Sequence, residues 1–398
     1  MTRLRRLIAT ALVDSFGLSL GWTVFSLHVT ASRGLAGLGL CNAAMLVGVA
    51  LSAPVAARLS ARLDGRELLR LTCVTEAGLR VGTFVLLLAG APLVAVAVAV
   101  AASNVVAWTG YAGMRAEVAA ADPRGSAMTW YMVAVAAIEA AGTATAALLP
   151  VGPGGLASGG LLVAVIAGYG ACLLPTWLVA GGALVARAAR PRTAGLRGVL
   201  AGRRLLPNGP PNGLLASGSL VMLLGSGPTL LAVGLAAQMH GTRWVAGSAL
   251  AFAAGSLLAP FLVARLERRT LPPAIAWPAL GVGMVGGWAF AALSPLALLA
   301  AQLLSGMCMS ALEGDMDARV ATKATTPGRA TAGLATAAAL RAFGSAAAVA
   351  MAPRVVAEAG IGWLAGALGI GLATLAVLRL AWWLRHRAEA GRRALASP

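Results

Sequence analysis

The feature that most constrains this chain is a series of apolar stretches of 18 or more residues that recurs along its whole length. At about 1.5 Å per residue, a helix of this length crosses a hydrocarbon core of roughly 30 Å. Backbone polar groups in lipid need partners within their own segment, so we expect helices. The short alternating segments of a membrane β-barrel are absent from the sequence. We predict twelve spans, at 7–30, 35–57, 71–91, 92–114, 127–150, 159–186, 213–238, 244–264, 271–294, 295–317, 330–352 and 357–384.

The basic residues lie almost entirely in alternate connections between these spans. The net charge is +18, from 31 lysine and arginine residues against 13 acidic ones. Cytoplasmic loops carry such an excess, so we expect both termini in the cytoplasm. Because spans interrupt the arginines, we expect no nucleic-acid partner. The basic groups are Arg3, Arg5 and Arg6; Arg58, Arg62, Arg66 and Arg70; Arg187, Arg190, Arg192, Arg197, Arg203 and Arg204; Arg265, Arg268 and Arg269; Lys323 and Arg329; and Arg385, Arg387, Arg392 and Arg393.

Composition excludes a soluble body and gives no sign of catalysis. Hydrophobic residues make up 59% of the chain and charged residues 11%, which leaves too little polar surface to coat a soluble protein of 398 residues. The cysteines have no metal-ligand spacing, and no phosphate-binding glycine loop precedes a lysine. We therefore expect neither an enzyme nor a bound metal or cofactor.

The second half of the sequence repeats the first at an offset of about 202 residues. Residues 114–119 (MRAEVA) align with 316–321 (MDARVA), and 139–142 (EAAG) with 341–344 (RAFG). A constant offset near half the chain length indicates duplication. We predict an N-terminal six-helix bundle at 1–186, a basic linker at 187–212, and a C-terminal six-helix bundle with a short basic tail at 213–398.

The loop after the second span carries part of a family motif. The motif reads Gly-x-Leu-Ala-Asp-Arg-x-Gly-Arg-Arg; here Leu59 and Arg62 match in register, and Gly65 and Arg66 come one residue late. With its six-plus-six helices, the whole chain resembles the major facilitator superfamily. The resemblance implies an all-α integral membrane fold of twelve helices in two bundles related by a pseudo-twofold axis. It also implies a central cavity and transport by alternating access.

Two polar stripes are the candidate walls of that cavity. Asn104, Trp108, Tyr111 and Arg115 share one helix face, and their repeat partners are Gly306, Ser310, Glu313 and Asp317. A charge near the bilayer centre costs at least about 2.5 kcal/mol, so these faces should avoid lipid. The alternative is helix packing held by polar contacts. The predicted substrate cavity comprises Asn104, Trp108, Tyr111, Ser310, Glu313 and Arg341.

Acidic side chains inside the spans are candidates for proton coupling. Asp14 lies in the first span, with Glu139 and Glu313 as further candidates; an acid such as Asp14 could instead bond nearby backbone. Glu139 and Arg341 occupy equivalent depths, and we expect them to pair or to face the cavity. Glu76 and Arg80, four residues apart, predict a local pair near the cytoplasmic interface.

Opposite charges occupy equivalent positions at the cytoplasmic ends of the stripes. Arg115 and Glu117 in the first half correspond to Asp317 and Arg319 in the second. We predict that Arg115 pairs with Asp317, and Glu117 with Arg319, when the cytoplasmic side closes. The alternative is that these charges are solvated ends that interact with lipid headgroups.

Three functions remain open from the sequence. Proton-coupled export of a small organic or drug-like compound leads, metabolite uptake or exchange is second, and a non-transporting receptor or lipid-handling protein is third. The expected partners are a small-molecule substrate, protons and membrane lipid, with the protein a monomer. A single lysine among 31 basic residues suggests a GC-rich bacterial genome, and hence the bacterial inner membrane.

Overall fold

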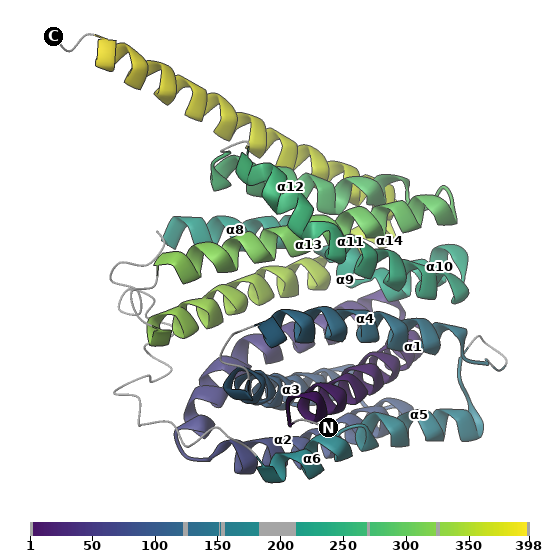
Figure 1. Ribbon diagram of the computed structural model, residues 1–398. Helices are drawn as coiled ribbons and strands as arrows, with labels where there is room; N and C mark the ends of the chain where they lie inside the picture. The colour runs from purple at the N-terminus through teal and green to yellow at the C-terminus, as the bar shows by residue number, and fades with distance from the viewer. Residues whose placement is uncertain are drawn as a thin grey trace.

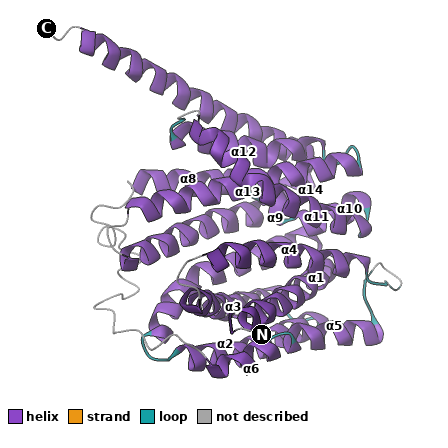
Figure 2. Cartoon of the chain, viewed as in Figure 1, coloured by secondary structure: helices purple, strands orange, loops and turns teal. Residues whose placement is uncertain are grey.

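A computed structural model describes residues 3–121, 126–150, 152, 156–182, 212–268, 271–323 and 327–395. The described part of the chain contains helices, turns and loops but no strand (Figure 2). The predicted linker at 187–212 lies outside the described residues, apart from Asn212. The division into domains at that linker therefore stays a prediction.

The N-terminal half is built from helices that follow the predicted spans closely (Figure 1). They are α1 Arg3–Ser60, α2 Gly65–Leu88, α3 Leu93–Ala121, α4 Ser126–Leu148, α5 Gly159–Ala171, α6 Leu174–Val179 and the 3-10 turn η1 Ala180–Gly182. The C-terminal half comprises α8 Asn212–Gly225, α9 Gly227–Leu230, α10 Ala232–His240, α11 Arg243–Arg268, α12 Pro273–Gly286, η2 Gly287–Phe290, α13 Pro295–Lys323 and α14 Pro327–Leu395.

The longest helices, α1 and α14, each contain two crossings. Gly34 in α1 has φ 69°, and Gly360 in α14 has φ 81°. Only glycine adopts this region without strain, and the chain turns back at both residues. Among the described residues, eight helices are long and apolar enough to cross a membrane, and two shorter apolar helices, Ala134–Leu148 and Leu215–Gly225, accompany them. The two turns and the two shorter helices bring the crossings to twelve, as predicted.

Equivalent contacts in the two halves confirm the pseudo-twofold relation. The Thr23 hydroxyl donates to the Thr143 hydroxyl at 3.3 Å, and the Ser226 hydroxyl donates to the Ser345 hydroxyl at 3.1 Å. Thr143 and Ser345 are 202 positions apart. In each half the contact joins the first helix of the bundle to the fifth.

Close helix crossings at glycine repeat in the same way. A Cβ added at Gly142 would meet the carbonyl oxygen of Phe16, and one at Gly344 would meet that of Ser219. Both glycines therefore let the fifth helix of a bundle approach the backbone of the first. The repeat seen in the sequence is thus a repeat of packing as well.

The hydrophobic cores show that the two halves are joined at one face only. We call the face with the N-terminus and the exposed Arg62, Arg66 and Arg265 the basic face, and the face with the turns at Gly34 and Gly360 the opposite face. A single buried cluster near the opposite face draws on both halves, through α1, α4 and α5 together with α10, η2 and α14. Toward the basic face the buried clusters belong to one half or the other.

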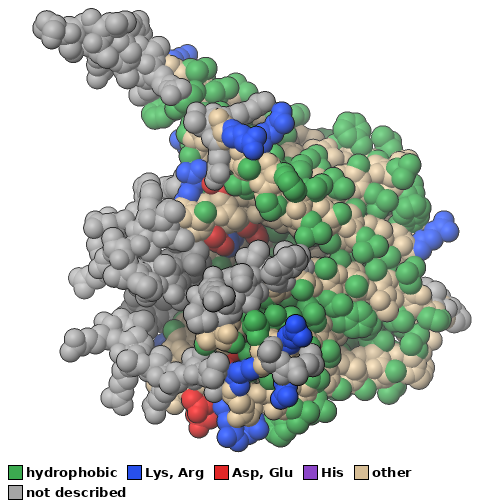
Figure 3. Space-filling model, viewed as in Figure 1, with side chains coloured by type: hydrophobic (Ala, Val, Ile, Leu, Met, Phe, Trp, Pro, Cys, Tyr) green, Lys and Arg blue, Asp and Glu red, His purple; other side chains and the backbone are tan. Residues whose placement is uncertain are grey.

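Polar contacts between the two halves also lie near the opposite face. The Asn42 amide donates to the Leu230 carbonyl oxygen at 2.7 Å. A Cβ added at Gly39 would lie 2.5 Å from the carbonyl oxygen of Val349. Figure 3 shows acidic and basic side chains in a hollow between the two halves on the side where charged side chains gather. The described structure is therefore closed at the opposite face and open toward the basic face.

Candidate functional site

The N-terminal half contains a buried charge network centred on Arg80 of α2. The Arg80 side chain is 1% exposed, and its Nη2 donates to Asp14 Oδ1 at 2.9 Å and to Glu76 Oε1. Nη1 donates to the Tyr169 carbonyl oxygen at 3.2 Å and to Cys172 Sγ at 3.0 Å. The predicted pair of Glu76 and Arg80 is confirmed, but it is buried within the bundle. It also includes Asp14, which its spacing in the sequence did not indicate.

A break between α5 and α6 supplies one of these acceptors. Pro175 has no amide hydrogen, and the Leu173 amide bonds to Gly170 at 3.4 Å, so the helix is interrupted after Ala171. The Tyr169 carbonyl oxygen is therefore free to accept from Arg80. The Tyr169 ring also lies 5.1 Å from the guanidinium carbon, as a cation–π contact.

A small cavity lies beside this network, inside the N-terminal half. Asp14 is 28% exposed at its side chain, whereas Glu76 and Thr176 are buried. Tyr111 and Tyr131 stack at 6.2 Å between ring centroids. The lining residues are Ala11, Asp14, Ser15, Leu69, Thr72, Cys73, Glu76, Ala107, Gly110, Tyr111, Met114, Tyr131, Leu173 and Thr176.

Glu139 on α4 is the second candidate for proton coupling. It is half-buried, and it has no hydrogen bond or ion pair within the described part of the chain. It lies close enough to Asp14 for the two carboxylates to repel each other. The structure thus brings together two of the three predicted proton carriers, Asp14 and Glu139.

The C-terminal half holds the third candidate beside Arg341. Arg341 Nη1 and Nη2 donate to the two carboxylate oxygens of Asp317, at 2.6 and 3.3 Å. Its Nε lies 3.9 Å from Glu313 Oε1. The Arg341 side chain is 11% exposed, whereas Glu313 and Asp317 are 40% and 42% exposed. Arg341 therefore pairs within its own half rather than with Glu139.

The predicted gate residues also have partners in their own halves. Arg3 Nη2 donates to Glu117 at 2.8 Å, and Arg319 pairs with Asp315 at 2.8 Å. Arg115 lies over the Tyr111 ring, at 5.7 Å from its centroid. Ion pairs of Arg115 with Asp317 and of Glu117 with Arg319 are not present among the described residues. Because the halves are separate at this face, these pairings stay predictions for a state in which it is closed.

The predicted stripes serve several purposes. The Asn104 amide donates to the Val100 carbonyl oxygen at 2.9 Å. Trp108 meets Tyr111 edge to face at 5.4 Å and keeps 42% of its surface exposed. Gly306 packs against the backbone of Phe252, and Ser310 is half-buried on α13. Part of the second stripe is therefore used for helix packing.

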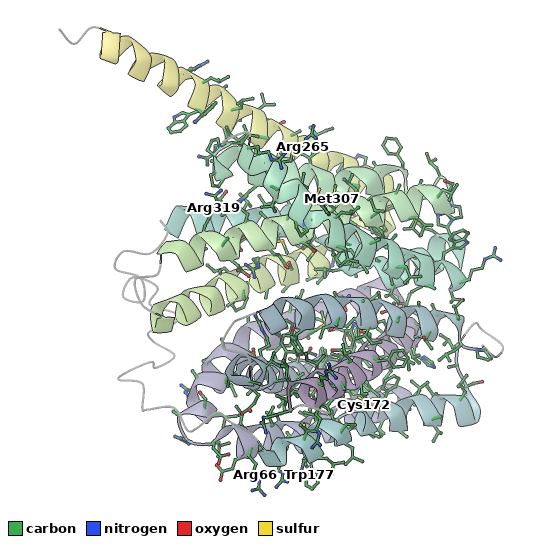
Figure 4. The ribbon with its side chains drawn as sticks, viewed as in Figure 1. Arg66, Cys172, Trp177, Arg265, Met307 and Arg319 are labelled. Atoms are coloured by element: carbon green, nitrogen blue, oxygen red, sulfur yellow. The ribbon has the colours of Figure 1, made fainter. Side chains whose placement is uncertain are left out.

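The loop motif forms the connection from α1 to α2. The Leu59 carbonyl oxygen accepts from the Arg62 amide at 2.9 Å, and Gly65 is the first residue of α2. The Asp64 side chain accepts from the Glu67 amide at 2.8 Å and caps that helix. Arg62 and Arg66 are exposed, and Figure 4 shows Arg66 on the N-terminal half and Arg265 on the C-terminal half.

Sequence reasoning missed Glu76, Arg80, Thr176 and Tyr131 as site residues. The sequence paired Glu76 with Arg80 but did not assign the pair to a site; the signal for that was two charges inside an apolar span, since such charges are seldom placed without a role. Figure 4 shows Cys172, which contacts Arg80, within the N-terminal half. Nothing in the sequence connects Cys172 or Thr176 to Asp14. Cys172 lies near Asp14, and Thr176 lines the same cavity, only because α5 and α6 pack against α1 and α2.

No protein-family model matches the sequence, and no curated protein matches it. Solved structures do match over nearly the whole chain. The nucleoside transporter NupG has 13% identity and a TM-score of 0.71, covering 96% of this chain and 99% of that one. A D-xylose-proton symporter has 16% identity and a TM-score of 0.66, covering 94% and 96%. The human organic anion transporter MFSD10 has 18% identity and a TM-score of 0.62, covering 95% and 100%.

Proposed function

The chain has the fold of the major facilitator transporters, and we propose that it is a secondary transporter that moves a small organic solute by alternating access. The observation that carries this proposal is the distribution of the cores. The halves share one core near the opposite face and have separate cores toward the basic face. Alternating access requires the two halves to rock, so that the basic face closes while the shared core at the opposite face separates.

Proton coupling is the second part of the proposal. Asp14, Glu139 and Glu313 are carboxylates within membrane-spanning helices, and each is partly exposed. A carboxylate in this setting is neutralised by one proton, which lowers the cost of moving it into a closed, dry state. The basic face would be cytoplasmic, because its arginines follow the bias of cytoplasmic loops. We place the protein, as a monomer, in a bacterial inner membrane.

Export by proton antiport is the direction that we favour. The aromatic side chains of Trp108, Tyr111 and Tyr131 suit an amphipathic organic compound, and the acids beside them suit a cationic one. Uptake is the second candidate, because a D-xylose-proton symporter is among the similar structures. Export and uptake would both use the space between the two halves and the same carboxylates. They differ only in how solute binding and proton binding are linked.

Flux in proteoliposomes tests the proposal. We would load vesicles with a pH-sensitive dye, impose a pH gradient of either sign, and add organic cations, nucleosides and sugars in turn. If the protein is a proton antiporter, added solute dissipates the pH gradient as solute and protons move in opposite directions. If it is a symporter, solute and protons move in the same direction. If no compound changes proton flux and no labelled solute crosses the membrane, the protein is not a secondary transporter for these classes.

A further inference from the structure

The cavity in the N-terminal half carries more negative charge than its arginine can balance. Asp14 and Glu76 both accept from the same nitrogen of Arg80. Their other oxygens, Asp14 Oδ2 and Glu76 Oε2, accept no hydrogen bond from the described residues. Within the cluster of Asp14, Glu76 and Arg80, two carboxylates and one guanidinium leave one negative charge over. An uncompensated charge in a bundle interior costs several kcal/mol, so the site favours one further positive charge.

An unpartnered hydroxyl faces the same cavity. Thr176 is 5% exposed and lines the cavity, and its Oγ1 has no hydrogen-bond partner in the described part of the chain. A buried hydroxyl without a partner loses its hydrogen bonds to water and gains none within the protein, at a cost of about 1–3 kcal/mol. A ligand that accepts the lone pairs of this oxygen would remove the cost. Protonation of the two carboxylates would neutralise the surplus charge, but it would not give the Thr176 hydroxyl a partner.

The backbone of α3 leaves room for such a ligand. Gly110 lines the cavity, and a Cβ there would lie 3.0 Å from Thr72 Oγ1 and 3.9 Å from Glu76 Oε2. Any larger residue at this position would occupy space next to the free carboxylate oxygen. The cavity therefore combines space, two free carboxylate oxygens and hydroxyl groups.

We propose that this cavity binds one Na⁺ through the carboxylates of Asp14 and Glu76 and the hydroxyl of Thr176. The donor atoms are oxygens, which hard cations prefer, and the single surplus charge matches a monovalent ion. The proposed ligands include no imidazole or thiolate, which transition metals prefer. Binding itself does not depend on transport. A role for Na⁺ as a coupling ion that competes with protons at Asp14 rests on the proposed function.

The test is direct binding of radioactive ²²Na⁺ to the purified full-length protein at constant pH, with choline chloride maintaining ionic strength. We expect saturable binding of one ion, displaced by unlabelled Na⁺, and a rise in the melting temperature with Na⁺ but not with choline. Thr176→Val keeps the shape and removes the hydroxyl, and it should weaken Na⁺ binding at least tenfold while leaving the melting temperature in choline the same or higher, because the unpartnered hydroxyl is gone. Glu76→Gln should abolish binding.

Thr83→Val is the matched control. Thr83, on α2, is also buried, but its hydroxyl donates to the Leu79 carbonyl oxygen at 2.7 Å, and Thr83 does not line the cavity. The Thr83→Val variant should bind Na⁺ like the wild type. The proposal is overturned if the folded wild type shows no saturable Na⁺ binding, or if the Thr176 and Thr83 variants bind alike. Na⁺ binding without solute flux would refute the transport proposal alone, and solute-driven proton flux without Na⁺ binding would refute this site alone.

Discussion

At the scale of single residues, the two buried arginines differ in how their partners meet solvent. Arg80 holds Glu76, which is 4% exposed at its side chain, whereas Arg341 holds Asp317, which is 42% exposed. The sequence predicted that charges inside spans must find partners, and each of these two arginines does. It did not predict which partners, because Arg80 meets Asp14 only through the packing of α1 on α2. The equivalent depths of Glu139 and Arg341 predicted that the two residues either pair or face the cavity, and the described residues contain no such pair.

Removing Arg80 should destabilise the protein more than removing Arg341. Arg80→Met leaves two carboxylates without a cation, one of them fully buried, and breaking a buried pair in this way costs about 3–5 kcal/mol. Arg341→Met leaves carboxylates that water reaches, so we expect a smaller loss. Thermal unfolding in detergent measures both. Adding Glu76→Gln to Arg80→Met should restore part of the stability, and equal losses for the two arginine variants would contradict this account.

Neutralising Glu139 should lower coupled proton flux without lowering the stability of the fold. Glu139 has no hydrogen-bond partner among the described residues, and Asp14 repels it, so Glu139→Gln should leave the melting temperature unchanged or raise it slightly. Coupled proton flux in proteoliposomes should fall at least tenfold if Glu139 carries the proton. Glu67→Gln, a change at the exposed start of α2, is the control. Unaltered coupling in the Glu139 variant would assign the proton to Asp14 or Glu313.

At the scale of elements, the sequence predicted the spans to within a few residues for most helices. The span at 244–264 is α11 Arg243–Arg268, and the span at 295–317 is α13 Pro295–Lys323. The spans at 159–186 and 213–238 are instead interrupted, between α5 and α6 and between α8, α9 and α10. Pro175 and Pro228 were the available signals. Apolar length indicates that a segment crosses the membrane, but it says nothing of breaks that neighbouring helices stabilise.

The glycine crossings are the element contacts most open to test. A Cβ at Gly142 would lie 2.6 Å from the Phe16 carbonyl oxygen, and Gly344 is in the equivalent position against Ser219. Gly142→Leu and Gly344→Leu should each cost about 1–3 kcal/mol or more, because backbone must move. Gly168→Ala and Gly366→Ala, where a Cβ meets open space, should be nearly neutral. Similar melting temperatures for all four variants would show that these crossings do not constrain the fold.

At the scale of the whole molecule, the internal repeat and the positions of the charged residues together predict how the basic face closes. The pseudo-twofold axis relates Arg115 to Asp317 and Glu139 to Arg341, so each residue would approach a partner of opposite sign when the halves close. The offset of 202 residues predicted the equivalence of these positions. It could not predict the conformation, because the charges within one half, such as Arg341 and Asp317, also satisfy each other.

Exchanging charges tests the closed state. Arg115→Asp places like charges opposite each other and should reduce transport at least tenfold. Combining it with Asp317→Arg should restore part of the rate, although the second change also removes the partner that Arg341 has in the open state. Initial rates of solute flux in proteoliposomes measure the effect. A double variant no faster than Arg115→Asp alone would exclude a direct pair between these residues.

The most direct test of alternating access is a pair of distance measurements by spin labelling in liposomes. One pair of labels replaces Arg66 and Arg265 on the basic face, and the other replaces the exposed Leu88 and Leu293 near the turns of the opposite face. As solute and pH shift the conformation, we expect the first distance to shorten whenever the second lengthens. An opposite-face distance that stays fixed under every condition, while solute is transported, would contradict the account, because the shared core would then be a permanent joint rather than a gate.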